Sequence, residues 1–518
     1  MNHEEIALPS KGCSRVLMIG IDAAEITLIE RWLADGHLPN LKSLRQRGTF
    51  AELTSTADWL VASPWATFYT GRPPEEHGLN QYLIWRPETM ASERPAPDWL
   101  PLPRFWHDLG RAGRRSIVVN VPLTYAPEPF EGIEISGYAT HERLMTPASH
   151  PPEILDWVHR SFTAPAPDQE EGRLLARGEP SAIRDRVNGA TDAVAEVGSA
   201  LMRDHPWDLF LLCFSATHRA GHALWDTTSL ADRGTATKDE MTDALRAVYV
   251  ACDGALGRLV AEAGPATQVL VFSVHGMGPN TSRNSVLPEM LERVLAGGTD
   301  ADEAAPRRRL LQQVRELLPN EWRTWVKRRL PTSVQDRMTA YWRTGGIDWS
   351  GTRAFVPFCD LEGFVRINLR GREASGIVAP EREYERLLGE IADGLASFVD
   401  EDTGEPVVAD LARRDELYQE GPRRDLLPDL IVRWSPGHAA KHRRLVSPRH
   451  GAVAWPTPGH VPSGRSGHHR PTGFLLAAGD RIAGPARIEG GHILDLAPSV
   501  FALLDLEAPR GMPGRALF

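Results

Sequence analysis

The sequence predicts an α/β fold in which a mainly parallel sheet is sandwiched by helices and carries an inserted cap region. Two observations predict it: short apolar runs rich in Val and Ile, and helical patterns between most of these runs. Strands buried on both faces read as continuous apolar runs, and their alternation with helices is typical of parallel sheets. The runs are RVLMIGID (15–22), SIVVNVP (116–122), DLFLLCFS (208–215), QVLVFSVHG (268–276) and GFLLAAG (473–479).

The first run is followed directly by a helical pattern, ITLIERWLADG, which ends in Gly36. A glycine after the last apolar position is a helix stop signal, so this unit reads as strand, loop, helix. In an open α/β sheet, ligands gather outside the carboxyl ends of the strands. We therefore expect the functional site among the polar residues that follow the apolar runs.

The chain of 518 residues is longer than one hydrophobic core usually grows, which is roughly 250 to 300 residues. The pattern changes within residues 283–445. We predict that residues 14–282 and 446–518 form the core and that 283–445 form an inserted cap. The insertion contains the Arg-rich stretch PRRRLLQQVRELLPNEWRTWVKRRLP (306–331). Its basic face could meet an anionic membrane or a polyanionic substrate, or it could be a solvated helix with its tryptophans packed inward.

Composition excludes several classes of protein. The 58 Lys and Arg against 68 Asp and Glu give a net charge of -10, which argues against nucleic acid as a stable partner. The N-terminus has acids where a signal peptide needs a basic start, and no transmembrane segment is expected. Four widely spaced cysteines indicate neither a disulfide framework nor a thiolate zinc site, which favours a cytoplasmic location; they are Cys13, Cys213, Cys252 and Cys359.

Histidines and one aspartate follow several of the apolar runs. Asp22 ends the first run, where a helix N-cap is the simpler reading. His218 and His222, in FSATHRAGHALW, are four residues apart and share one face of a helix, a spacing that suits zinc, although they could be two surface histidines. His275, in FSVHGMGPN, also follows a run, and the SGHHRPTG segment precedes the last one. We expect these separate strand ends to supply one metal centre.

A candidate nucleophile lies in ASPWATFYTGRPPEEHG (62–78). Ser63, Thr67 and Thr70 are all candidates, and each could instead be a capping or turn residue. A serine hydroxyl needs activation, and coordination to a divalent cation provides it by stabilising the alkoxide.

In chain order, the segments IDAAE, SPWATFYTGRPPEEHGL, THRAGH, FSVHGMGPN and SGHHRPTG resemble the alkaline phosphatase superfamily. Within it, the chain is similar to the type I phosphodiesterase and nucleotide pyrophosphatase group and its phosphohydrolase or phosphomutase relatives. The segments GFVRINLRGREASGIV and HILDLAPSVFALLDLEAPRGMPGRAL extend the likeness over nearly the whole chain. The resemblance implies an alkaline-phosphatase-like fold and a metal-dependent reaction on a small-molecule phosphate ester.

The resemblance also implies roles for the residues. Asp22 and His275 would bind one metal together with the nucleophile. The other metal would be bound by His218, His222 and His469. We choose His469 over His468 because it directly precedes Arg470 and Pro471, as the metal histidine of the family often does; His468 remains the alternative. His77 would be structural.

The chain departs from the family pattern at three positions. His218 stands where the family usually has an aspartate, and Val274 replaces the aspartate of Ser-Asp-His-Gly. Val61 stands at the usual nucleophile position, and Ser63 is the nearest hydroxyl. With less negative charge, the site of Asp22 should hold its cation more weakly. We therefore expect one or two zinc ions, with manganese as an alternative.

The function predicted from these residues is hydrolysis of phosphate monoesters or diesters by a Ser63 nucleophile. Two alternatives stay open. A phosphomutase would return the phosphate to another hydroxyl of the substrate, and a catalytically silent binding protein would keep the fold without the chemistry. The sequence carries no signal for the oligomeric state.

Overall fold

The structure is a computed structural model. It describes residues 15–124, 128–139, 147–162, 174, 178–225, 236–297, 334, 337–338, 344, 347–437, 439–456, 459 and 461–518. The Arg-rich stretch 306–331 lies outside the described residues, and so do the two interpretations of it.

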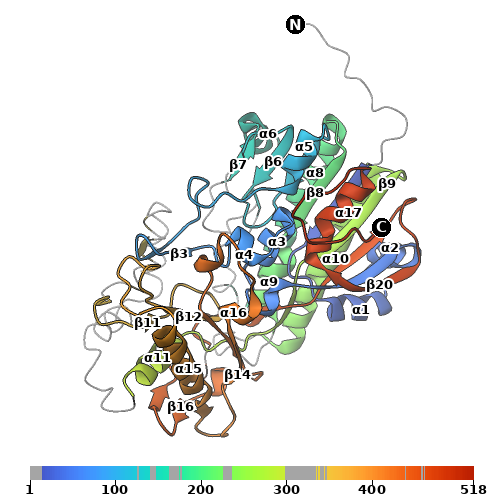
Figure 1. The fold of residues 1–518 in the computed structure, drawn as a ribbon. Helices are drawn as coiled ribbons and strands as arrows, with labels where there is room; N and C mark the ends of the chain where they lie inside the picture. Colours follow the sequence, from blue (N-terminus) through green and yellow to red (C-terminus); the bar gives the residue numbers. More distant parts are fainter. Residues whose placement is uncertain are drawn as a thin grey trace.

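A nine-stranded sheet forms the centre of the molecule, in the order β20-β2-β19-β9-β1-β8-β5-β6-β7 (Figure 1). The strands β9, β1, β8, β5 and β6 are parallel to one another, and β2 is parallel to β20. Antiparallel pairs join β19 to both β9 and β2, and β7 to β6. The strands are β1 (Arg15–Ile21), β2 (Thr49–Thr54), β5 (Ser116–Val119), β6 (Gly132–Ser136), β7 (Ala148–His150), β8 (Leu209–Phe214), β9 (Thr267–Ser273), β19 (Gly473–Ala478) and β20 (Ala486–His492).

Helices cover both faces of the sheet because the strands are apolar on both sides. In β1, Leu17 and Ile19 pack into one cluster and Val16 and Met18 into another. The helices of the first cluster are α1 (Ile26–Ala34), α2 (Pro39–Arg47), α6 (Pro152–Ser161), α8 (Pro180–Asp204), α9 (Ala216–Leu224) and α10 (Lys238–Ala263). Those of the second are α3 (Pro64–Thr70), α5 (Phe105–Arg111) and α17 (Leu496–Leu503). This layered architecture is the one the apolar runs predict.

A second body of structure lies at one end of the molecule, away from β6 and β7 (Figure 1). Its own apolar cluster runs from Val286 to Trp455 and includes Leu60. A four-stranded antiparallel sheet forms part of it, in the order β11-β12-β15-β14, and a three-stranded sheet has the order β13-β16-β17. We call this body the cap.

The elements of the cap are α11 (Leu287–Leu295), β11 (Ala354–Phe355), β12 (Gly363–Ile367), α15 (Arg382–Ala396), β13 (Val399–Asp400), β14 (Val408–Arg413), α16 (Arg414–Leu417), β15 (Leu430–Trp434), β16 (Arg444–Ser447) and β17 (Gly451–Ala454). Short elements near the junction are η1 (Thr56–Asp58), α4 (Pro74–His77), β3 (Ile84–Arg86), β4 (Ala91–Glu93), β10 (Gly276–Pro279), η3 (Arg424–Leu426) and β18 (Gly467–Arg470). The division of the chain at 283 and 445 stays a prediction.

Within the described ranges, no helix combines the length and the apolar character that crossing a bilayer requires.

Candidate metal centre

Three neighbouring parallel strands bring the predicted site residues to one edge of the sheet. The strands β9, β1 and β8 are adjacent, so their carboxyl ends meet there. Asp22 follows β1 directly, the helix α9 with His218 and His222 follows β8, and His275 follows β9. The order of the strands is therefore what collects residues that are more than 190 positions apart in the chain.

A two-stranded ribbon completes the site. The strand β10, just after His275, pairs antiparallel with β18, and Met277 lies opposite His469. This pairing places the His469 ring on that of His275, with centroids 4.3 Å apart and planes 29° apart. The His469 ring centroid is also 4.7 Å from that of His218 and 5.1 Å from that of His222.

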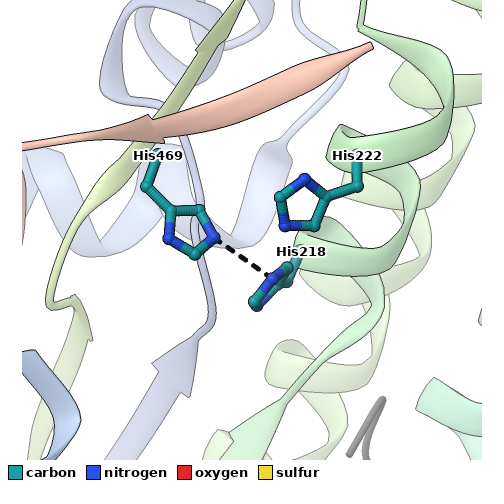
Figure 2. A group of neighbouring side chains, drawn as sticks. All are labelled: His218, His222 and His469. Carbon is teal, nitrogen blue, oxygen red and sulfur yellow. Dashed lines mark hydrogen bonds between the residues drawn. The ribbon is translucent and has the colours of Figure 1, made fainter. Parts of the chain in front are cut away.

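The three histidines His218, His222 and His469 lie close enough together to hold a metal ion. One ring nitrogen from each lies within 4.8 Å of the other two, and Figure 2 shows the rings facing a common point from one helix and one strand. The two Nε2 atoms of His218 and His469 are 3.2 Å apart. A tetrahedral zinc with Zn–N bonds of 2.0 to 2.1 Å separates two nitrogen ligands by about 3.3 Å. His469, rather than His468, belongs to this group.

Hydrogen bonds engage the Nδ1 atoms of two of these rings. His218 Nδ1 lies 2.6 Å from Asp22 Oδ2, and His222 Nδ1 lies 2.8 Å from the carbonyl oxygen of Gly467. Both oxygens are acceptors, so each Nδ1 carries the hydrogen and each Nε2 presents a lone pair. Burial lowers the pKa of His469 well below its usual value, and the neighbouring imidazoles lower it further. The neutral imidazole is the form that binds metal, so this shift favours His469 as a ligand.

Asp22 lies behind His218 at the base of the site. It is fully buried, and its Oδ1 accepts a hydrogen bond of 2.8 Å from Trp65 Nε1. Asp22 is not a helix cap: the N-cap of α1 is Glu25, whose side chain accepts from the Thr27 N–H. The sequence reasoning missed Trp65, which no metal-ligand pattern includes.

His275 is near Asp22 but offers less to a second cation. Its Nε2 is 3.6 Å from Asp22 Oδ1, and burial lowers its pKa to about 4. Next to it, Val274 is fully buried and contributes to the apolar cluster beneath the sheet edge. Among the described residues, a contact on this side joins one carboxylate and one imidazole.

Ser63 precedes α3, and its hydroxyl is part of a buried chain of polar groups. Ser63 Oγ donates a hydrogen bond of 2.6 Å to Thr56 Oγ1, which lies 3.4 Å from Thr67 Oγ1. Thr67 Oγ1 in turn is 3.0 Å from His77 Nε2. The described contacts do not join Ser63 to the histidines directly, but η1, which carries Thr56, packs beside β18, which carries His469.

His77 is a neutral structural residue in this chain of groups. Its Nδ1 accepts a hydrogen bond from the Leu79 N–H, so its Nε2 carries the hydrogen and donates to Thr67. Burial lowers the pKa of His77 to about 3. His77 therefore has no free lone pair to take a proton from Ser63 through the threonines.

The cap contributes one buried carboxyl group to the loop before Ser63. Glu362 accepts hydrogen bonds from the Val61 N–H and, at 2.7 Å, from Gln81 Nε2. Burial raises the pKa of Glu362 well above its usual value. The sequence reasoning missed Glu362, because no local signal marks a contact between residues 301 positions apart.

Comparisons with known proteins identify the family and the fold of the chain. The sequence matches the family described as type I phosphodiesterase / nucleotide pyrophosphatase over residues 16–451, whereas no curated protein matches it. Crystal structures of phosphonoacetate hydrolase from Sinorhizobium meliloti 1021 with phosphonoformate and with phosphonoacetate align with TM-scores of 0.52 and 0.50, at 14% and 15% identity over 95% of each chain. Murine ectonucleotide pyrophosphatase / phosphodiesterase 5 aligns at 0.49, with 12% identity over 97% of each chain. The family match and the shared fold confirm the resemblance and the fold class predicted from the motifs.

Proposed function

This chain belongs to the type I phosphodiesterase and nucleotide pyrophosphatase family, and on that premise we propose that it is a metal-dependent hydrolase of small-molecule phosphate monoesters or diesters. The observation that carries the proposal is the set of three imidazoles, His218, His222 and His469, whose ring nitrogens face one point. Three protein ligands with an open fourth position are the arrangement of catalytic rather than structural zinc sites.

The chemistry of the donors supports zinc as the cation. Imidazole nitrogen suits zinc, whereas manganese and magnesium prefer carboxylate and carbonyl oxygen. When bound, a divalent cation lowers the pKa of a hydroxyl or water near it and offsets negative charge on a phosphoryl group.

The surroundings of Ser63 support its role as the nucleophile that depends on such a cation. In the described part of the chain, the Ser63 hydroxyl is hydrogen-bonded to the hydroxyl of Thr56, which is no base. The imidazole of His77 carries its hydrogen on Nε2, the nitrogen that faces Thr67. These neighbours hold the Ser63 oxygen in place but supply no base. A serine without a base needs activation from another source to attack a phosphate ester.

The proposed reaction has two steps on this chain. Ser63 loses its proton as its Oγ forms a bond to the phosphorus; the bond from phosphorus to the ester oxygen breaks, and that oxygen leaves as the alcohol with a proton, which leaves a phosphoserine. A water molecule then attacks the same phosphorus and releases Ser63 with its hydroxyl restored. Half-buried Thr56 and buried Thr67 keep the Ser63 oxygen in one position for both steps.

The test uses 4-nitrophenyl phosphate and bis(4-nitrophenyl) phosphate. We expect turnover by the full chain with zinc, loss of turnover with chelator, and restoration on adding zinc back. Ser63→Ala should lower kcat by at least roughly 10³-fold, since removal of a nucleophile in other covalent enzymes costs more than this. The matched control is Ser181→Ala, an exposed serine in α8. Turnover that survives both chelator and Ser63→Ala would contradict the proposal.

A further inference from the structure

We propose that the chain binds a single divalent cation, at His218, His222 and His469, and that Asp22 orients His218 from behind instead of ligating a second cation. The inference rests on the metal centre of the proposed function and specifies how many ions it holds. It departs from the two-metal arrangement that the resemblance implies, in which Asp22 is a ligand.

Both carboxylate oxygens of Asp22 accept a hydrogen bond. Oδ2 accepts the hydrogen of His218 Nδ1 at 2.6 Å, and Oδ1 accepts the indole hydrogen of Trp65 at 2.8 Å. An ionised carboxylate is an acceptor only, and each of its two oxygens here accepts a hydrogen from a buried donor, which fixes the carboxylate between His218 and Trp65 but leaves lone pairs on both oxygens. Asp22 is therefore the partner of a metal-binding histidine, in the carboxylate–histidine–metal arrangement that orients the ring and raises its basicity.

A second cation would need ligands besides Asp22. Beyond Asp22, the donors on that side among the described residues are His275 and, if it turns away from Thr56, Ser63. The position before His275 is Val274, a buried apolar side chain that cannot ligate a metal. A catalytic zinc site usually has three protein ligands. With Ser63 hydrogen-bonded to Thr56, one carboxylate shared with His218 and one imidazole fall short of that number and carry little charge.

The variant Asp22→Asn tests whether Asp22 orients His218. Trp65 Nε1–H requires an acceptor, so an asparagine at this position turns its amide oxygen toward Trp65. Its NH₂ group then faces His218 Nδ1, which has to become an acceptor, and the hydrogen moves to Nε2. Binding the cation through Nε2 then requires the less favoured tautomer of His218, which weakens binding without removing the ligand, while the size of the residue 22 side chain is unchanged.

The experiment measures the metal content and affinity of the full chain. Zinc per chain is determined by mass spectrometry after dialysis, and zinc affinity by competition with a chelating dye. Cobalt(II) replaces zinc for visible spectroscopy, in which tetrahedral coordination gives intense bands. The variants are His218→Ala, His275→Ala and Asp22→Asn, and circular dichroism of each metal-free variant establishes folding.

We expect one ion per wild-type chain, no tightly bound ion in His218→Ala, and one ion with unchanged affinity in His275→Ala. The pair is matched because each change removes one buried imidazole near Asp22. Asp22→Asn should keep the ion but weaken its binding by about 10- to 100-fold, the usual effect of losing the hydrogen-bond partner of a ligand. If Asp22→Asn does not fold, the counts in wild type and His275→Ala decide the question.

Two ions per wild-type chain, falling to one in His275→Ala, would overturn the inference. An unchanged affinity in Asp22→Asn would overturn the orienting role of Asp22. None of these measurements requires turnover, so a chain that binds one ion and hydrolyses no ester would refute the proposed function and leave this inference standing.

Discussion

Gly467 of β18 lies so close to Gly221 of α9 that a β-carbon on Gly467 would overlap the Gly221 carbonyl oxygen. The same contact lets His222 Nδ1 reach the Gly467 carbonyl at 2.8 Å. Two residues without side chains thus set the distance between the helix that carries His218 and His222 and the strand that carries His469.

Gly467→Ala should therefore damage the metal centre. The added methyl group pushes β18 away from α9, so we expect at least a tenfold loss of zinc affinity by dye competition. The free energy of unfolding, measured with urea, should fall by about 1 to 3 kcal/mol, the usual cost of overpacking. The control is Gly189→Ala in α8, where a β-carbon meets nothing within 4 Å. Equal zinc affinity in Gly467→Ala and wild type would show that this contact does not position the ligands.

His77 should make the fold less stable as the pH falls. Burial lowers its pKa in the folded chain to about 3, whereas the unfolded chain binds this proton with a pKa of roughly 6.5. Between these values the unfolded state holds more protons than the folded state. The contribution of His77 to the free energy of unfolding is therefore complete above roughly pH 6.5 and decreases toward pH 3, by up to about 1.4 kcal/mol per pH unit.

The test is chelator-treated protein unfolded in urea at pH 7.0 and 5.0. Relative to wild type, His77→Gln should reduce the stability difference between the two pH values by about 2 kcal/mol. The exposed His37, changed to Gln, should leave that difference as it is. An identical difference in wild type and His77→Gln would mean that His77 is protonated or exposed in the folded chain.

Glu362 should make the fold less stable as the pH rises, which is opposite to the effect of His77. Burial raises the pKa of Glu362 in the folded chain well above the usual value. In the unfolded chain the same carboxyl group has a pKa of about 4.3. Above that value the unfolded state is favoured as the pH rises, until the folded group also ionises. The glutamine of Glu362→Gln stays neutral in both states. The difference between the melting temperatures of Glu362→Gln and wild type should therefore shift in favour of the variant as the pH rises from 5 to 8.

A second variant separates charge from contact. Glu362→Ala removes the acceptor of the Val61 N–H and the Gln81 amide and should lower the melting temperature at every pH. Differential scanning fluorimetry across pH 5 to 8 measures all three chains. Melting curves for wild type and Glu362→Gln that stay parallel over this range would rule out a buried neutral carboxyl group.

Much of the fold and part of the site could be predicted because the signals are local. The apolar runs indicate strands, and β1, β8 and β9 lie where RVLMIGID, DLFLLCFS and QVLVFSVHG predict them. The i, i+4 spacing of His218 and His222 on a helix depends only on helix geometry. The roles of Ser63 and of the predicted metal ligands stay predictions.

The contacts of Trp65, Thr56 and Glu362 could not be predicted in this way. Trp65 donates to a carboxylate 43 positions earlier, and Glu362 reaches Val61 from the cap. Such contacts depend on how layers of structure pack, and nothing in the neighbouring residues encodes them.

By itself, the sequence determined that the chain forms an α/β sheet and that acid and imidazole groups follow its strands, because apolar periodicity and strand ends are properties of short segments. Only the tertiary structure decided that the hydrogen of His218 points to Asp22 and that His469, not His468, faces His218. The physical reason is that a ligand set is defined by distances of a few ångströms between segments far apart in the chain. Those distances arise from strand order, the pairing of β10 with β18 and the close packing of Gly467 on Gly221.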